Sequence, residues 1–174
     1  MSAPVSPGEE TFSFSLDLPV RNEWRNVELL RTSVENCFQA VFADVDGKSA
    51  ISMVTGELLE NALKYGDWES ESARRAFRLR VDGDRDKAVV MVQNPIKPGD
   101  PGLDEVLATV AWIRTFKTPG DAYRARLLEI AQAEGDEVGP SRLGLVRVAY
   151  EGNCTVDAEV EGTTLTITAR MALR

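Results

Sequence analysis

The sequence predicts an α+β fold, a two-layer sandwich in which helices cover one face of a mixed, mostly antiparallel sheet. Three observations predict it. Segments typical of strands and helices come in blocks, as one strand, two helices, a hairpin, further helices and a last hairpin. The strand–helix–strand alternation that favours a parallel sheet does not occur. With 174 residues and no interior linker, we expect residues 11–174 to form a single domain after a flexible N-terminal lead-in, residues 1–10.

The first three elements follow from periodicity. Residues 11–18 alternate between apolar and polar types, which predicts a half-buried strand closed by Pro19. Residues 20–43 carry apolar side chains at spacings of three and four, which predicts an amphipathic helix. These apolar residues are Trp24, Val27, Leu30, Val34, Cys37, Phe38 and Val41. A second helix is expected at 48–65, with Gly66 placed to end it.

The middle of the chain predicts a hairpin followed by helices. Residues 76–81 and 87–93 are strand-like runs joined by the turn-rich sequence DGDRD. Three prolines and two glycines in residues 94–102 predict that the chain leaves the sheet there in an irregular conformation. Helical patterns follow at 103–114 and 121–134.

The last segments complete the predicted sheet. A loop at 135–142 leads into a short helix at 143–150. Residues 154–160 and 164–171 then form a hairpin across Glu161-Gly162.

Composition excludes several classes of function. Twenty Lys and Arg against 28 Asp and Glu give a net charge of −8, which disfavours binding to nucleic acid or to an anionic membrane surface. The chain contains no histidine, so imidazole-based triads, most catalytic zinc sites and phosphorylation on histidine are excluded. Cys37 and Cys154 form no CxxC pair and are expected to be free thiols. Without an export signal or an apolar run long enough to cross a bilayer, we expect a cytoplasmic protein.

The segment GELLENALKYG, residues 56–66, carries the most informative pair of polar residues. Glu57 and Asn61 are four residues apart, so a helix places both side chains on one face. A carboxylate can act as a base, and an amide oxygen is a ligand suited to Mg²⁺. Spacing alone favours the alternative that both residues lie on a solvated helix face.

A second candidate is the glycine-bearing loop GPSRLGL, residues 139–145, directly before a predicted helix. Backbone N–H groups at a helix start bind anions such as phosphate, and Arg142 could add a direct contact. A plain helix start explains the same residues. A third segment, GTTLTI at 162–167, alternates hydroxyl and apolar residues, which a strand explains by itself.

In this order, the three segments resemble the ATP-binding domain of the histidine-kinase/gyrase-like (GHKL) superfamily, which includes sensor histidine kinases, type II topoisomerases, a heat-shock chaperone and mismatch-repair ATPases. The superfamily's N box, E-x-x-x-N-A-x-x-Y/H, is matched at Glu57, Asn61, Ala62 and Tyr65. The G2 box, usually GxGLGL, is similar to the loop ending in Leu143, Gly144 and Leu145. Gly162 and Thr163 fit the GT pair that opens a late strand.

The resemblance implies a histidine-kinase-like ATPase fold and a role for each matched residue. Asn61 would coordinate Mg²⁺ at the nucleotide phosphates and Glu57 would be the base. The remaining cofactor-binding residues would be Lys64, Asn94, Arg142, Leu143, Gly144, Leu145 and Thr163, where Lys64 and Arg142 reach phosphates and Thr163 helps to hold the adenine. A solvent-facing side chain is the alternative for Lys64. Residues 95–139 would be the flap over the nucleotide.

One box departs from the pattern. The superfamily's G1 box, DxGxG, places an aspartate against the adenine amino group, whereas this chain has Asn94-Pro95-Ile96-Lys97 at that point. A neutral amide makes a weaker hydrogen bond there than a carboxylate. The G2 box also has Ser141 and Arg142 in place of its first glycine turn. These departures motivate an alternative function without useful ATP binding.

Within the superfamily, the chain is most similar to stand-alone anti-sigma-factor kinases and SiaB-like serine/threonine kinases of bacterial partner-switching systems. The resemblance implies an ATP- and Mg²⁺-binding kinase that acts on Ser or Thr of a small antagonist of the STAS type or of a sigma-factor-type regulator. The alternatives are a degenerate switch protein that sequesters a partner without catalysis, and an unrelated α+β domain. A homodimer through the first helix, around Trp24 and Phe38, competes with burial of those residues in the core.

Overall fold

A computed structural model describes residues 11–17, 23–42, 46–69, 71–132 and 143–173. Within them the elements are β1 (Phe12–Leu16), α1 (Trp24–Val41), α2 (Lys48–Tyr65), α3 (Glu71–Arg74), β2 (Arg78–Gly83), β3 (Lys87–Pro95), α4 (Pro101–Ile113), α5 (Pro119–Gln132), α6 (Gly144–Glu151), β4 (Cys154–Glu161) and β5 (Thr164–Ala172). The predicted lead-in at 1–10 and the predicted loop at 135–142 lie outside the described residues.

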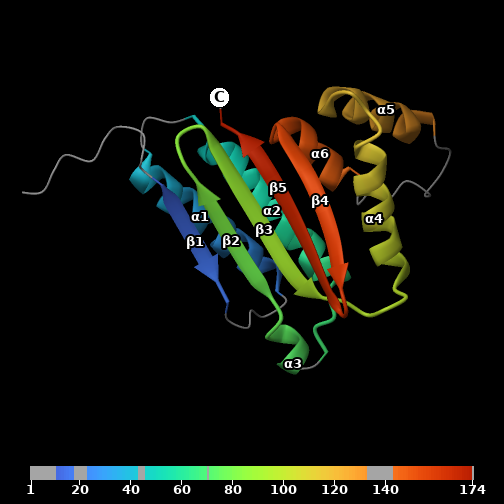
Figure 1. The fold of residues 1–174 in the computed structure, drawn as a ribbon, viewed down its shortest axis with the longest axis horizontal. Coiled ribbons are helices and arrows are strands. Elements are labelled where there is room, and N and C mark those ends of the chain that lie inside the picture. Colours follow the sequence, from blue (N-terminus) through green and yellow to red (C-terminus); the bar gives the residue numbers. More distant parts are fainter. Residues whose placement is uncertain (1–10, 18–22, 43–45, 70, 133–142, 174) are drawn as a thin grey trace, which may run out of the picture.

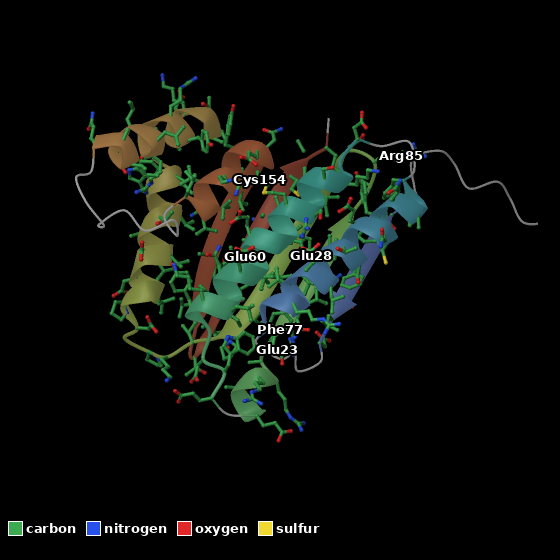
Figure 2. All side chains as sticks on the ribbon, turned by 180° about the vertical axis from the view of Figure 1, so that it is seen from behind. Glu23, Glu28, Glu60, Phe77, Arg85 and Cys154 are labelled. Carbon is green, nitrogen blue, oxygen red and sulfur yellow. The ribbon has the colours of Figure 1, made fainter. Side chains whose placement is uncertain are left out.

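The sheet has five strands in the order β1-β2-β3-β5-β4. All four pairings are antiparallel, so the described sheet contains no parallel pair, and the expectation of a mixed sheet is corrected on this point. Helices α1 and α2 lie side by side over one face, and α4 and α5 lie beyond β4 (Figures 1 and 2). The predicted α+β two-layer sandwich is confirmed.

One hydrophobic core lies between the sheet and the helices. At its α1 side, Phe38 is fully buried, with its ring centroid 5.9 Å from that of Phe12 and 5.1 Å from that of Phe42. Phe38 therefore belongs to the core and offers no surface for a dimer, whereas the Trp24 side chain lies outside the described part of the chain. Both cysteines are free thiols, as expected, and burial raises the pKa of Cys154 to about 12.

The boundaries of α2 are those that the sequence predicts, and Gly66 caps its end. A Cβ at Gly66 would lie 2.4 Å from the Ala62 carbonyl oxygen and 2.5 Å from Nε1 of Trp68, which itself donates to the same carbonyl at 3.2 Å. Only glycine fits between the helix end and the indole. The polar connector that follows contains the short helix α3, which the pattern did not predict.

The prediction that residues 94–102 are irregular is wrong for the first two of them. Asn94 and Pro95 continue β3 and pair with Leu165 and Thr164 of β5. The reason is tertiary: β5 lies alongside and supplies hydrogen-bonding partners that the local sequence does not reveal. The chain leaves the sheet after Pro95, whose carbonyl accepts a hydrogen bond from the backbone N–H of Asp67 at 2.8 Å.

Helix α4 begins two residues before the predicted start because its cap is specified by side-chain chemistry. Asp100 accepts a hydrogen bond from the backbone N–H of Gly102 at 2.7 Å, and Pro101 occupies the first position. At the other end, Nε of Arg114 donates to the Val156 carbonyl at 3.3 Å. This contact helps to cover the outer edge of β4.

No helix of the described residues is both long enough and apolar enough to cross a membrane.

Candidate functional site

The candidate site begins on α2, where Glu57 faces α6 and Asn61 follows one turn later on the same side of the helix. The neighbouring positions Leu58 and Ala62 are buried in the core, which sets the rotation of the helix. The adjacent Glu60 is exposed on the outer side of α2 (Figure 2). The predicted pair is therefore held at the junction of α2 and α6 by the packing of the apolar positions around it.

Glu57 makes an ion pair that sequence reasoning missed. Its Oε1 accepts a hydrogen bond from Nη1 of Arg147 on α6 at 2.9 Å, across 90 positions of sequence. Arg147 also reaches Glu151, one turn further along α6, with Nε–Oε1 3.1 Å and Nη2–Oε2 3.2 Å. The four-residue spacing of Arg147 and Glu151 is visible in the sequence. The contact with Glu57 is not, because it joins segments 90 positions apart.

Burial dominates the electrostatics of Glu57. Desolvation raises the pKa of this carboxyl above its ordinary value, Arg147 opposes the rise, and the neighbouring Glu60 and Glu151 add to it. The pKa of Arg147 is also raised, first by its hydrogen bond to Glu151. An ion pair alone would lower the pKa of Glu57, so the rise shows that the loss of water around the carboxylate outweighs its attraction to Arg147.

Gly144 brings the start of α6 against Glu57. A Cβ at this position would lie 2.8 Å from Oε2 of Glu57, closer than such atoms approach. Gly144 is the first residue of α6, follows Leu143 at the cap, and precedes Leu145, whose side chain is buried in the core. Leu143, Gly144 and Leu145 thus place the first turn of α6 beside the Glu57 carboxylate. Arg142 lies outside the described residues.

Asn61 carries an unpaired buried donor. Its Nδ2 is shielded from solvent and has no hydrogen-bond partner. Buried polar atoms in folded proteins are nearly always paired, so each exception needs an explanation, and a functional role is one of them. Among the described residues, Thr55 Oγ1 and Arg126 Nε are also buried and unpaired. An amide left without an internal bond suits a ligand with acceptor oxygens.

The remaining predicted residues lie on other elements. Asn94 is buried on the helix-facing side of β3, and its Nδ2 donates to the Pro95 carbonyl at 3.1 Å. Thr163 is exposed in the hairpin turn after Gly162, where its carbonyl accepts from the backbone N–H of Ile96 at 2.8 Å. The end of β3 and the start of β5 are therefore adjacent. No contact described here joins Asn94 or Thr163 to Glu57.

Lys64 is exposed, and its Nζ lies 4.9 Å from the centroid of the Tyr65 ring. The same ring packs against the start of α4, where a Cβ at Gly102 would lie 2.5 Å from Cδ1 of Tyr65. Helix α4, within the predicted flap, contributes Leu103 and Val106 to the core. Within residues 95–132, the described part of the predicted flap, helices α4 and α5 pack onto the rest of the fold.

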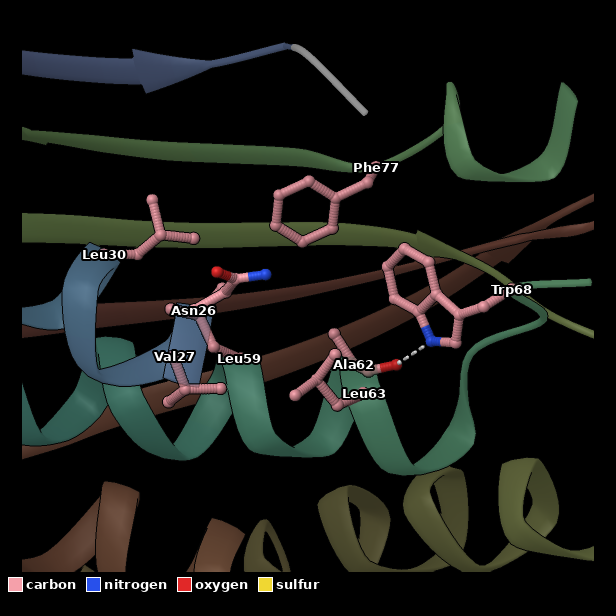
Figure 3. A pocket seen from close by; sticks show the side chains of 8 residues that line it. All are labelled: Asn26, Val27, Leu30, Leu59, Ala62, Leu63, Trp68 and Phe77. Atoms are coloured by element: carbon pink, nitrogen blue, oxygen red, sulfur yellow. Dashed lines mark hydrogen bonds between the residues drawn. The ribbon is translucent and has the colours of Figure 1, made fainter. Parts of the chain in front are cut away.

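Two pockets help to delimit the site. A pocket between α1 and α2 measures about 10 Å³, room for little more than one water molecule, which excludes it as a nucleotide site (Figure 3). Its lining is formed by Asn26, Val27, Leu30, Leu59, Ala62, Leu63, Trp68 and Phe77. A larger groove of about 380 Å³ lies at the C-terminal end of α2, where Tyr65, Asp67 and Lys97 line it among others.

The described residues hold no cluster of three or more Asp, Glu, Cys or His side chains able to bind a metal by themselves. Mg²⁺ in phosphate-binding enzymes keeps most of its ligands outside the protein, so a site for it needs few protein oxygens. Asn61 is the residue that would supply such an oxygen.

Comparison with known proteins gives a likeness in fold. No protein-family model matches the chain, and no curated protein matches it. Among solved structures, one chain of the crystal structure of the SiaB–SiaC complex from Pseudomonas aeruginosa superimposes with a TM-score of 0.60 and 15% sequence identity. The match covers 91% of this chain and 88% of that chain. At this identity the likeness shows the fold alone.

Proposed function

We propose that this protein is a Mg²⁺- and ATP-binding regulatory kinase that phosphorylates Ser or Thr of a small partner protein in a partner-switching signalling system. The observation that carries the proposal is the meeting of Glu57 with the start of α6 at Gly144, beside the unpaired amide of Asn61. The fold likeness to a chain solved in a complex of two proteins, SiaB and SiaC, supports a regulator that acts through a protein partner.

The residues present suit Mg²⁺ and the nucleotide phosphates. The Asn61 oxygen is the kind of ligand that Mg²⁺ takes. Its Nδ2 makes no hydrogen bond within the described fold. The first-turn amides of α6, at Gly144 and Leu145, offer N–H groups to an anion at the positive end of the helix dipole. Bound Mg²⁺ would neutralise charge on the phosphates during transfer.

Glu57 is the group that would accept a proton. In the transfer, the hydroxyl oxygen of the partner's Ser or Thr forms a bond to the γ-phosphorus, and the bond to the β-phosphate oxygen breaks to release ADP. The hydroxyl proton passes to the Glu57 carboxylate. The raised pKa of Glu57 suits this role, since a base works best when its pKa lies near the working pH.

The test is a calorimetric titration of the purified protein with ATP, with and without Mg²⁺, followed by transfer of labelled γ-phosphate to a candidate partner. Saturable binding that requires Mg²⁺, with label found on Ser or Thr of the partner, is the expected result. The absence of binding at millimolar ATP would refute the kinase.

A second candidate function is sequestration of a partner without catalysis. It is favoured by Asn94, a neutral residue at the aspartate position of the G1 box whose Nδ2 already donates to the Pro95 carbonyl. A protein of this kind would bind its partner equally well with and without ATP. Measuring partner affinity in both conditions separates the two functions.

A substitution at Gly144 is expected to damage transfer without damaging the fold. In Gly144→Ala the added methyl group must displace the Glu57 carboxylate from its place beside Arg147. Because the displaced atom ends a side chain and is not backbone, little stability is lost. Misplacing a catalytic group by about 1 Å costs about 100-fold in rate. We expect a loss of about that size in phosphate transfer, with a melting temperature unchanged within about 2 °C.

The matched control is Gly120→Ala on α5, where the new Cβ would meet Tyr150 at 3.5 Å, an ordinary contact distance. Normal transfer by Gly144→Ala would show that the closeness of α6 to Glu57 has no catalytic use.

A further inference from the structure

The contact between Glu57 and Arg147 joins the two helices that form the candidate site. Arg147 lies on α6, three residues after Gly144, and its guanidinium uses Nη1 for Glu57 at 2.9 Å. Its other described bonds, from Nε and Nη2, go to Glu151 on the same helix. Glu151 thereby holds the guanidinium in one orientation, with Nη1 directed at α2.

The pair is neither a surface pair nor a fully buried one. The Glu57 side chain is 18% exposed and that of Arg147 is 37% exposed. A carboxylate with this little access to water depends on a fixed cation to remain ionised and to keep one rotamer.

We propose that Arg147 is a positioning residue, which orients the Glu57 carboxylate beside the first turn of α6 and favours its ionised form. The role of Arg147 in a reaction rests on the proposed kinase function. The orientation itself is a property of the folded chain and is measurable without nucleotide.

Among the described residues, the charged and titratable groups that act on the pair come from three helices. They are Glu57 and Glu60 of α2, Arg147 and Glu151 of α6, and Tyr123 of α5, which lies near Arg147. Among these groups Arg147 is the one cation, and it opposes the effects of burial, Glu60 and Glu151 on Glu57. Removing its charge while keeping its apolar stem should therefore raise the pKa of Glu57 further.

The experiment follows the side-chain carboxyl of Glu57 by ¹³C NMR over pH, in the full chain without nucleotide, with Glu57→Gln to assign the resonance. In Arg147→Met we expect the pKa of Glu57 to rise by about one pH unit relative to the unsubstituted protein. Arg147→Lys keeps the positive charge but lacks the planar guanidinium with its several donors. It should give a Glu57 pKa between those of Arg147→Met and the unsubstituted protein.

The matched control is Arg75→Met, which removes an exposed arginine whose guanidinium pairs with Glu71 at 2.8 Å on α3. It should leave the titration of Glu57 unchanged. In the unsubstituted protein, the ¹⁵N resonance of Arg147 Nη1, the atom bonded to Glu57, should also shift with the same midpoint as Glu57. This second readout needs no variant, so it decides the matter even if Arg147→Met does not fold.

Two results would overturn the proposal. One is a Glu57 pKa that is the same in Arg147→Met as in the unsubstituted chain. The other is an Arg147 Nη1 resonance that does not shift when Glu57 titrates. If the protein transfers phosphate, the acidic limb of its pH–rate profile should move to higher pH in Arg147→Met. A merely structural ion pair would lower the melting temperature and leave that limb in place. Failure to bind ATP would remove the kinase function and leave the NMR result standing.

Discussion

Replacing Asn61 by alanine is expected to abolish Mg²⁺-dependent ATP binding and phosphate transfer while the fold remains intact. The substitution removes the one α2 oxygen assigned to Mg²⁺, and we expect ATP affinity in the presence of Mg²⁺ to fall at least about 100-fold, about 2.8 kcal/mol. The amide nitrogen it removes has no hydrogen-bond partner, so no such bond is lost from the fold. Calorimetric titration measures the affinity, and thermal unfolding checks the fold.

Glu60→Gln is the control for Asn61→Ala, because Glu60 is on the same helix, one residue before Asn61, and is exposed. It should bind ATP as the unsubstituted protein does. An Asn61→Ala variant that retains Mg²⁺-dependent binding would show that the nucleotide site does not lie on this face of α2.

Replacing Phe38 by alanine is expected to cause a large loss of stability. The ring is fully buried and packs against Phe12 of β1 and Phe42 after α1. Substitutions of this kind cost about 3–5 kcal/mol, a large part of the 5–15 kcal/mol typical of a whole domain. Urea unfolding should show a lower midpoint for Phe38→Ala.

The control for Phe38→Ala is Leu29→Ala on the same helix, where the side chain is 54% exposed. Its free energy of unfolding should change by no more than about 0.5 kcal/mol. A loss at Phe38 that disappears at high protein concentration would indicate an interface between two copies and contradict its place in the core.

Much of the fold was predictable because the spacing of apolar residues, and the Gly and Pro residues that end elements, indicate most of its helices and strands. Helix α2 has the predicted bounds, and the alternation of Phe12, Phe14 and Leu16 places β1 correctly with one face on the core. The predictions are wrong where contacts with a distant part of the chain determine the local structure. Asn94 and Pro95 extend β3 because β5 pairs with them, and proline-rich composition alone argued for a loop.

The candidate site was likewise predictable only in part. The positions of Glu57 and Asn61 on one helix face follow from their spacing. Their surroundings do not: Arg147 reaches Glu57 from 90 positions away, and the unpaired state of the Asn61 amide depends on what packs over it. Neither contact leaves a signal in the local pattern.

The sequence by itself determined the types and order of the elements other than α3, the α+β class, and that the polar pair shares one helix face. These depend on periodicities of two and 3.6 residues and on capping chemistry. The tertiary structure alone decided the strand order β1-β2-β3-β5-β4, the end of β3, and the ion pair that sets the charge environment of Glu57. The physical reason is that these features arise from contacts between distant segments. Their energies depend on packing and desolvation, which exist only once the chain has folded.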